Sequence, residues 1–157
     1  KPNGIHYANG FYFMTGSSNL LGPTLSQKAD ITTTSFWTKR AAFTGAYKII
    51  HDGSNYLVAG TQGVSTTASI GVSADLVSWT YLLVTDINTA LYDIAYDATG
   101  GYIAVGKAGM VLISSDGLNW TQQVPVTSVD LNNVLWDATA AHWVVIGASG
   151  TVLTVVP

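Results

Sequence analysis

Short runs of apolar residues alternate with turn-forming residues along the whole chain. The stretch 91–121 shows this pattern most clearly, because turn-forming residues at 97–101, 106–109 and 115–117 divide it into apolar segments. Short segments rich in Val, Ile, Tyr and Thr and bounded by Gly, Asp and Asn are typical of β-strands. The stretch therefore predicts four consecutive strands, the last of which begins at Trp120.

The same four-strand unit recurs, and four columns of residues mark it. Successive copies of a glycine near the end of the second strand are 44, 46 and 41 residues apart, and a tryptophan before the fourth strand recurs at 42 and 41. This period is typical of β-propeller blades, whereas ankyrin and tetratricopeptide arrays are helical and repeat every 33 or 34 residues or so. The columns are Tyr7, His51, Tyr96 and Trp136; Tyr12, Tyr56, Tyr102 and Trp143; Gly16, Gly60, Gly106 and Gly147; and Trp37, Trp79 and Trp120.

The repeat predicts an all-β propeller chain, with residues 1–157 forming one domain or segment. Four-stranded antiparallel blades with a period of about 42 residues are expected at about 1–40, 41–86, 87–130 and 131–157. The last blade lacks its tryptophan and fourth strand, so about 3.75 blades are present. Because an open propeller leaves unpaired edges, we expect a fragment of a larger propeller or a ring that another chain completes; a closed four-bladed ring is the alternative.

The segment 114–120, SSDGLNW, resembles the Asp-box of sialidase-like propellers, with one residue fewer between Asp and Gly. Weaker copies occupy 73–79 and, with extra residues inserted, 28–37. The resemblance implies a turn between strands three and four whose Asp accepts backbone N–H groups and whose Trp packs between sheets, a structural role. The residues concerned are Asp30, Trp37, Ser73, Asp75, Trp79, Ser114, Asp116, Gly117 and Trp120.

The same resemblance raises the question of glycoside hydrolysis. It implies three arginines for the substrate carboxylate of a sialidase, together with a Tyr nucleophile, a Glu partner and an Asp acid. The chain has one arginine, Arg40, and no Glu, so it is not a sialidase by itself. Six of its nine Asp fall in repeated turns, which leaves Asp86, Asp93 and Asp130 for a two-carboxylate mechanism. We expect no catalytic residue; a hydrolase that takes its groups from absent blades or a partner chain is the alternative.

Composition restricts the partners and cofactors. The net charge is −3 and the six basic residues are scattered, so a nucleic-acid partner is not expected. No apolar run is long enough to span a membrane as a helix. The chain has no Cys, and its three His lie in different repeats without metal-ligand spacing, so we expect no metal and no cofactor.

Long links between strands two and three, and between blades, share one face of a propeller. Loops on a rigid scaffold often hold binding residues, so we expect any ligand there. We predict a non-enzymatic binding or structural module, a phage tail or bacterial surface protein outside the cell or on a virion, that contacts glycan or another protein subunit. An assembly factor resembling those of photosystem II is a further alternative. The candidate ligand-face residues are Arg40, Asp86, Asn88, Tyr92, Lys107, Asp130 and Asn132.

Overall fold

The structure is a computed structural model that describes residues 2–17, 25–29, 38–41, 43–62, 67–83 and 89–157. Its strands form four antiparallel sheets, which confirms the all-β prediction. Sheet 1 contains β1 (Pro2–Ala8), β2 (Phe11–Gly16), β3 (Leu25–Lys28) and β4 (Thr38–Ala41), and sheet 2 contains β5 (Gly45–His51), β6 (Tyr56–Gln62), β7 (Thr67–Ser73) and β8 (Thr80–Leu83). Sheet 3 contains β9 (Leu91–Asp97), β10 (Gly101–Gly106), β11 (Val111–Ser114) and β12 (Thr121–Gln122), and sheet 4 contains β13 (Leu131–Asp137), β14 (His142–Gly147) and β15 (Val152–Val155).

Within each sheet the strands follow one another in chain order. The two aromatic columns of the sequence are cross-strand partners, because Tyr96 of β9 pairs with Tyr102 of β10, and Trp136 of β13 pairs with Trp143 of β14. Their rings lie 4.5 and 4.9 Å apart. Cross-strand aromatic pairs stabilise a hairpin and fix its register, so the sequence repeat is also a repeat of strand pairing.

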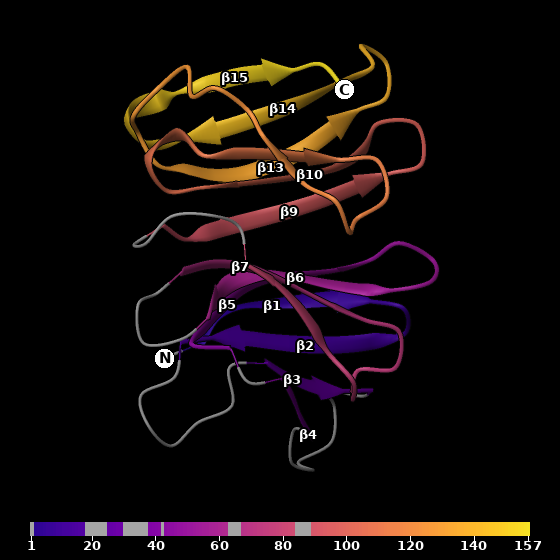
Figure 1. The fold of residues 1–157 in the computed structure, drawn as a ribbon. Coiled ribbons are helices and arrows are strands. Elements are labelled where there is room, and N and C mark those ends of the chain that lie inside the picture. The colour runs from indigo at the N-terminus through magenta and orange to yellow at the C-terminus, as the bar shows by residue number, and fades with distance from the viewer. Residues whose placement is uncertain (1, 18–24, 30–37, 42, 63–66, 84–88) are drawn as a thin grey trace.

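The four sheets stack face to face in chain order, from sheet 1 at the bottom of Figure 1 to sheet 4 at the top. The first strands are neighbours, since β1 contacts β5, β5 contacts β9, and β9 contacts β13. Three apolar cores fill the spaces between successive sheets. Each inner sheet therefore has a front face, which packs on the preceding sheet, and a back face, which packs on the following sheet.

Sheet 3 shows how strand alternation produces these two faces. Ile94 and Leu112 belong to the front face and pack against sheet 2, whereas Ile103, Val105 and Val111 belong to the back face and pack against sheet 4. All five are buried. Because successive side chains of a strand point to opposite faces, a sheet buried on both faces has a continuous apolar run such as 103–105 of β10.

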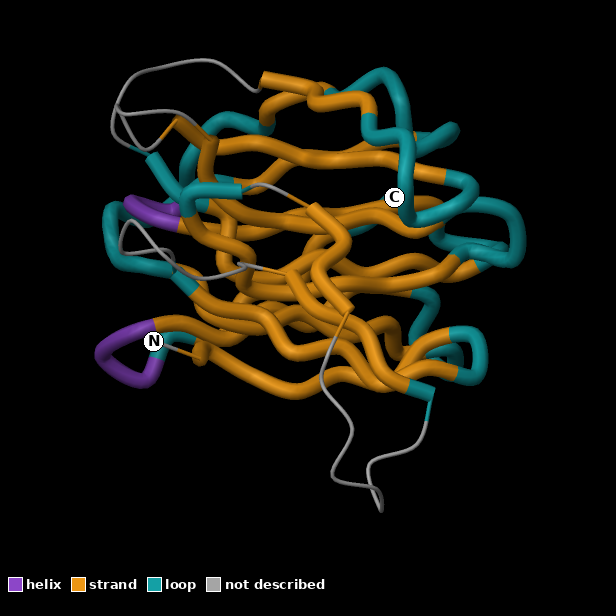
Figure 2. The backbone as a smooth tube through the Cα atoms, turned by 90° about the horizontal axis from the view of Figure 1, so that it is seen from below, coloured by secondary structure: helices purple, strands orange, loops and turns teal. Residues whose placement is uncertain are grey.

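The expected tight turn at 106–109 contains a 3-10 turn, η1 (Lys107–Gly109), and sheet 4 has its counterpart, η2 (Ala148–Gly150). Ala108 in η1 has φ 56° and Ser149 in η2 has φ 57°. Figure 2 shows both 3-10 turns at the same end of the strands. The connections β1–β2, β5–β6, β9–β10 and β13–β14 lie at the other end, because the two strands of a hairpin run in opposite directions.

Candidate functional site

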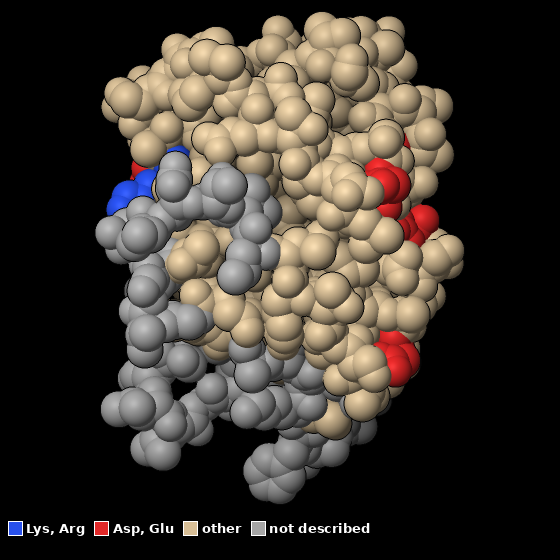
Figure 3. Space-filling view, in the orientation of Figure 1, with Lys and Arg blue, Asp and Glu red and all other residues tan. Residues whose placement is uncertain are grey.

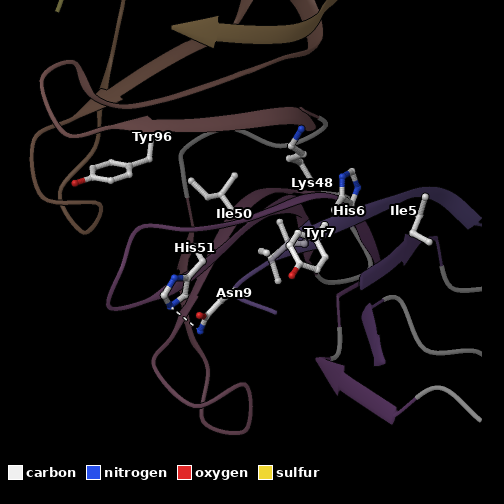
Figure 4. Close-up of a pocket in the computed structure, with 10 residues that line it drawn as sticks. Ile5, His6, Tyr7, Asn9, Lys48, Ile50, His51 and Tyr96 are labelled. Atoms are coloured by element: carbon white, nitrogen blue, oxygen red, sulfur yellow. Dashed lines mark hydrogen bonds between the residues drawn. The ribbon is translucent and has the colours of Figure 1, made fainter. Parts of the chain in front are cut away.

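A cleft of about 480 Å³ lies along the first strands of sheets 1, 2 and 3. Its wall comes from β1 and the β1–β2 turn, from β5, and from the single residue Tyr96 of β9. The cleft occupies the half of these strands that is nearer to the first-to-second-strand turns, as Figure 4 shows. The polar and aromatic side chains in its wall are those of His6, Tyr7, Asn9, Lys48, His51 and Tyr96.

His6 is fixed at one end of the cleft. Its Nε2 lies 3.0 Å from the carbonyl oxygen of Tyr47 and 3.0 Å from the hydroxyl of Thr15, so the ring joins sheet 1 to sheet 2. Burial, followed by the charge of Lys48, lowers the pKa of His6 below its usual value of 6.5. The imidazole is therefore neutral at physiological pH, and its Nε2–H donates to the Tyr47 carbonyl.

Asn9 and His51 form the other end of the cleft in Figure 4. The Asn9 side-chain nitrogen lies 3.4 Å from His51 Nε2 and donates a 2.8 Å hydrogen bond to the hydroxyl of Tyr56. The N–H of Gly53 donates to His51 Nδ1 at 3.2 Å. These contacts fix the orientation of the His51 ring, which presents a polar edge beside an amide.

Lys48 supplies the positive charge of the cleft and pairs with Asp93 at 3.5 Å. Asp93 is 3% exposed, and its other contacts are to the backbone: it accepts the N–H of Ile94 and, on β13, the N–H of Val134, both at 2.9 Å. The carboxylate therefore joins sheets 2, 3 and 4. This arrangement positions Lys48 and makes Asp93 a structural group.

Two tyrosines give the cleft aromatic surface. Tyr7 is 66% exposed, and its ring lies 5.1 Å from that of Tyr12. Tyr96 is half-buried and rests on Tyr102. Both residues belong to the aromatic column that ends the first strand of each repeat. The sequence repeat identified the column, but it could not show which of its members face an open cleft.

The loops that we expected to hold a ligand lie at the opposite end of the strands, where the structure forms a smaller cluster. The hydroxyl of Tyr92 donates to Asp130 at 3.3 Å, and its ring packs edge-on against Tyr47. Asp130 also accepts the N–H of Ala108 at 3.0 Å. Burial, then the Asp130 charge, raises the pKa of Tyr92. Tyr92 and Asp130, two of the predicted ligand-face residues, therefore hold the segment before sheet 4 against sheet 3.

The other predicted ligand-face residues are not brought together in the described part of the chain. Lys107 is exposed in η1, where its N–H donates to the carbonyl of Ala90 at 2.9 Å, and Asn132 is exposed on β13. Arg40 belongs to β4, and its side chain is outside the description. Asp86 and Asn88 lie outside the described residues.

The two described segments that resemble an Asp-box form the same turn. Asp116 Oδ1 accepts the N–H groups of Leu118 and Asn119 at 2.9 and 2.7 Å, and Ser114 Oγ accepts that of Gly117 at 2.9 Å. In sheet 2, Asp75 Oδ1 accepts the N–H groups of Val77 and Ser78, and Ser73 Oγ accepts that of Leu76. The half-buried Trp79 and Trp120 pack against the apolar cores, whereas Asp30 and Trp37 lie outside the described residues.

Acidic turns gather at one end of the strands, and Figure 3 shows acidic side chains along the right-hand edge. The N–H groups of Ser78 and Val77 lower the pKa of Asp75 to about 2. The backbone and side-chain N–H groups of Asn119 hold the pKa of Asp116 well below its usual range. In the turns between first and second strands, the Thr99 hydroxyl lowers the pKa of Asp97, and the Ala140 N–H lowers that of Asp137.

These shifts predict a chain that loses stability in acid. A carboxylate with a lowered folded-state pKa stabilises the fold above its unfolded pKa of about 3.9, and that stabilisation disappears as the pH falls through the folded value. The lowered pKa of His6 acts in the same direction below a pH of about 6.5. Urea unfolding between about pH 7 and pH 2 is expected to show a falling free energy of unfolding, with a shallower decline for Asp75→Asn. Constant stability over this range contradicts the prediction.

A second cleft, of about 600 Å³, lies beside the turns of sheet 3 and is bordered by Pro157. Tyr102, Ser114, Asn119 and Thr121 contribute to its wall. Among the described residues, no three His or Asp side chains are placed to hold a metal ion. The same residues include no helix that is long and apolar enough to cross a bilayer.

Comparison of the chain with family models, with curated proteins and with solved structures gives no match.

Proposed function

We propose that the chain is a non-enzymatic binding module of the β-propeller type, and that the cleft along β1, β5 and β9 binds a short glycan. The observation on which the proposal depends is the lining of that cleft. Exposed tyrosine surface lies there beside an amide, an ammonium group and two imidazoles, and no carboxylate is among the lining residues.

The propeller interpretation is supported by the arrangement of the sheets. Four sequential sheets pack face to face, and their first strands lie next to one another, as blades do around a propeller axis. The recurrence of the Ser-x-Asp turn in sheets 2 and 3 agrees with the Asp-box resemblance. The number of blades in a complete assembly depends on what covers the outer faces of sheets 1 and 4.

A binding role is supported by how the described carboxylates are used. The turn residues Asp52, Asp75, Asp97, Asp116 and Asp137 each accept backbone N–H groups of their own turn. Asp93 and Asp130 are engaged by Lys48 and Tyr92. The backbone N–H groups of the five turns lower the pKa of their carboxyl groups, whereas a glycosidase needs one carboxylic acid that can donate a proton at its working pH.

A glycan is the ligand class that suits this lining best. Tyrosine rings offer apolar faces to the C–H groups of a sugar ring, and an amide or imidazole edge exchanges hydrogen bonds with its hydroxyls. Tyr7 is already exposed, so little protein surface has to rearrange. The Lys48 ammonium group, 34% exposed beside Asp93, can donate a charge-assisted hydrogen bond, which favours a glycan that contains a carboxylate or sulfate group over a neutral one.

The test is calorimetric titration of the chain with defined oligosaccharides: sialyllactose, a chondroitin sulfate tetrasaccharide and neutral maltotetraose. We expect the acidic sugars to bind, and Tyr7→Ala to weaken binding about tenfold, or about 1.4 kcal/mol. Lys48→Met should abolish the preference for acidic over neutral sugars. Tyr92→Phe is the matched control, because Tyr92 lies at the other end of the strands.

Two results contradict the proposal. If Tyr92→Phe weakens binding while Tyr7→Ala does not, the ligand binds at the loops between sheets and the cleft is not the site. If reducing ends are released from any of the sugars, the chain is a hydrolase. Analysis of the same titration mixtures by chromatography measures that release directly.

A protein partner is the second candidate. The observation that favours it is separate from the cleft: the two outermost sheets have exposed apolar faces, which are typical of interfaces between proteins.

A further inference from the structure

The outer face of sheet 4 is apolar and uncovered. Strand pairing places Ile146 opposite Val152 and Leu135 opposite Val144, and these four side chains share the face that points away from sheet 3. Leu135 is 59% exposed and Val152 is 65% exposed. A sheet face that meets water is usually polar, so this face has the composition of an interface without the covering layer.

Register identifies this surface as a back face. Ile146 and Val152 of sheet 4 are cross-strand partners, as Val105 and Val111 of sheet 3 are. In sheet 3 that pair is buried against the following sheet. The equivalent pair of sheet 2, Ala59 and Ile70, is also buried, in its case against sheet 3.

The outer face of sheet 1 is the matching front face. Along β1, Ile5 and Tyr7 flank His6, whose ring contacts sheet 2. Because successive side chains of a strand point to opposite faces, Ile5 and Tyr7 point away from sheet 2. Ile5 pairs with Met14 in the register in which Ile94 pairs with Ala104. Ile94 is fully buried against sheet 2, whereas Ile5 is 59% exposed.

We propose that the back face of sheet 4 binds the front face of sheet 1 of a second copy of this chain. The contact repeats, between chains, the front-to-back packing that occurs three times within the chain. Both faces already have the side chains and the strand register of that interface. The proposal rests on this register and does not depend on a ligand in the cleft.

The energetics favour association. Burial of a large aliphatic side chain is worth about 1.5–3 kcal/mol, and Leu135, Ile146, Val152, Ile5 and Tyr7 would all leave water. Front and back faces differ, so the contact is head-to-tail. Such contacts either close into a ring or continue as a filament, and each copy uses both faces in either case.

Charge substitutions at two matched positions test the proposal. Leu135→Lys alters the back face and Ile5→Lys alters the front face, and the two native side chains have equal exposure. Val77→Lys, an exposed turn position outside both faces, is the control. The mass of each variant is measured by light scattering and sedimentation over roughly two orders of magnitude in concentration, with a thermal melt to confirm folding.

We expect the native chain and Val77→Lys to assemble, and each face variant alone to be monomeric. A mixture of Leu135→Lys with Ile5→Lys should form a one-to-one complex of twice the chain mass, because one intact front face and one intact back face remain. A native chain that is monomeric at every concentration overturns the proposal. If one face variant still dimerises alone, or the mixture remains monomeric, the contact is not front-to-back.

This outcome can be separated from that of the glycan proposal. Leu135 is outside the cleft, whereas Ile5 and Tyr7 line it and would be covered by a second copy, so the monomeric Leu135→Lys variant should bind oligosaccharide at least as tightly as the native chain. If the variant loses assembly and keeps binding, both proposals stand. A native chain that binds sugar but does not assemble removes this proposal alone. A monomeric Leu135→Lys variant that does not bind sugar, from a native chain that assembles, removes only the glycan proposal.

Discussion

Gly106→Ala is expected to abolish stable folding or to lower the free energy of unfolding by about 3 kcal/mol or more, the upper range for overpacking. A Cβ atom at Gly106 would lie 2.0 Å from the carbonyl oxygen of Ala90. That carbonyl accepts the N–H of Lys107 at 2.9 Å where the chain enters β9, so the two segments cannot separate without losing this bond. The φ of Gly106 is −170°, an extended conformation open to any residue, so the cost is steric.

The matched control is Gly150→Ala. Gly150 has φ +73° and has nothing within 4 Å of an added Cβ, so only the torsional cost of about 1 kcal/mol applies there. Circular dichroism and urea denaturation of both variants measure the difference. Equal effects, or a larger effect at Gly150, would show that close backbone approach is not the reason for glycine at position 106. Gly60 lies in the same situation, with 2.1 Å to the Gly45 carbonyl, and should respond as Gly106 does.

Asp93→Ala is expected to cost about 3 kcal/mol, because it removes the acceptor of a buried N–H and the partner of an ammonium group together. The Val134 N–H on β13 would lose its bond, and Lys48 would lose its ion pair. Asp93→Asn keeps an oxygen that can accept the Val134 N–H and should cost about half as much. Lys48→Met should cost least, because the Asp93 carboxylate keeps both of its backbone N–H donors when the ammonium group is removed.

Equilibrium unfolding of the three single variants and of the Asp93→Asn, Lys48→Met double variant provides the measurement. The double-mutant cycle isolates the ion pair from the backbone hydrogen bonds. We expect a small coupling energy between Lys48 and Asp93, with the larger share of the cost in the Val134 contact. If Lys48→Met is as damaging as Asp93→Ala, the ion pair is the main stabilising element and this assignment is wrong.

Much of the fold followed from local sequence. Strands require apolar runs bounded by turn formers, and those boundaries agree with the structure: the fourth strand of sheet 3 begins at Thr121, directly after Trp120. The turns that contain Asp75 and Asp116 depend on side-chain contacts within three residues. Such contacts are encoded by adjacent positions and are visible in a sequence pattern. The tight turn at 106–109 was expected, but the 3-10 form of this turn and of its counterpart in sheet 4 was not, because Ala108 and Ser149 have a left-handed conformation that their residue types do not signal.

The candidate site could not be predicted from the repeat in this way. Tyr7 and Tyr96 occupy equivalent positions of the period, and both pair across their hairpin with another tyrosine. Tyr7 is exposed because no described sheet covers the front face of sheet 1. Tyr96 faces the same cleft from sheet 3. Asp93 and Lys48 are 45 positions apart and meet only through the packing of β5 on β9.

By itself, then, the sequence determined the strands, their antiparallel order and the residues that form the turns, because these depend on neighbours along the chain. The tertiary structure alone decided which equivalent positions are buried and which are exposed. Ile94 and Ile5 have the same place in the pattern, yet only Ile94 has a sheet in front of it. Exposure depends on the neighbour across the face, and that neighbour is set by how the sheets stack.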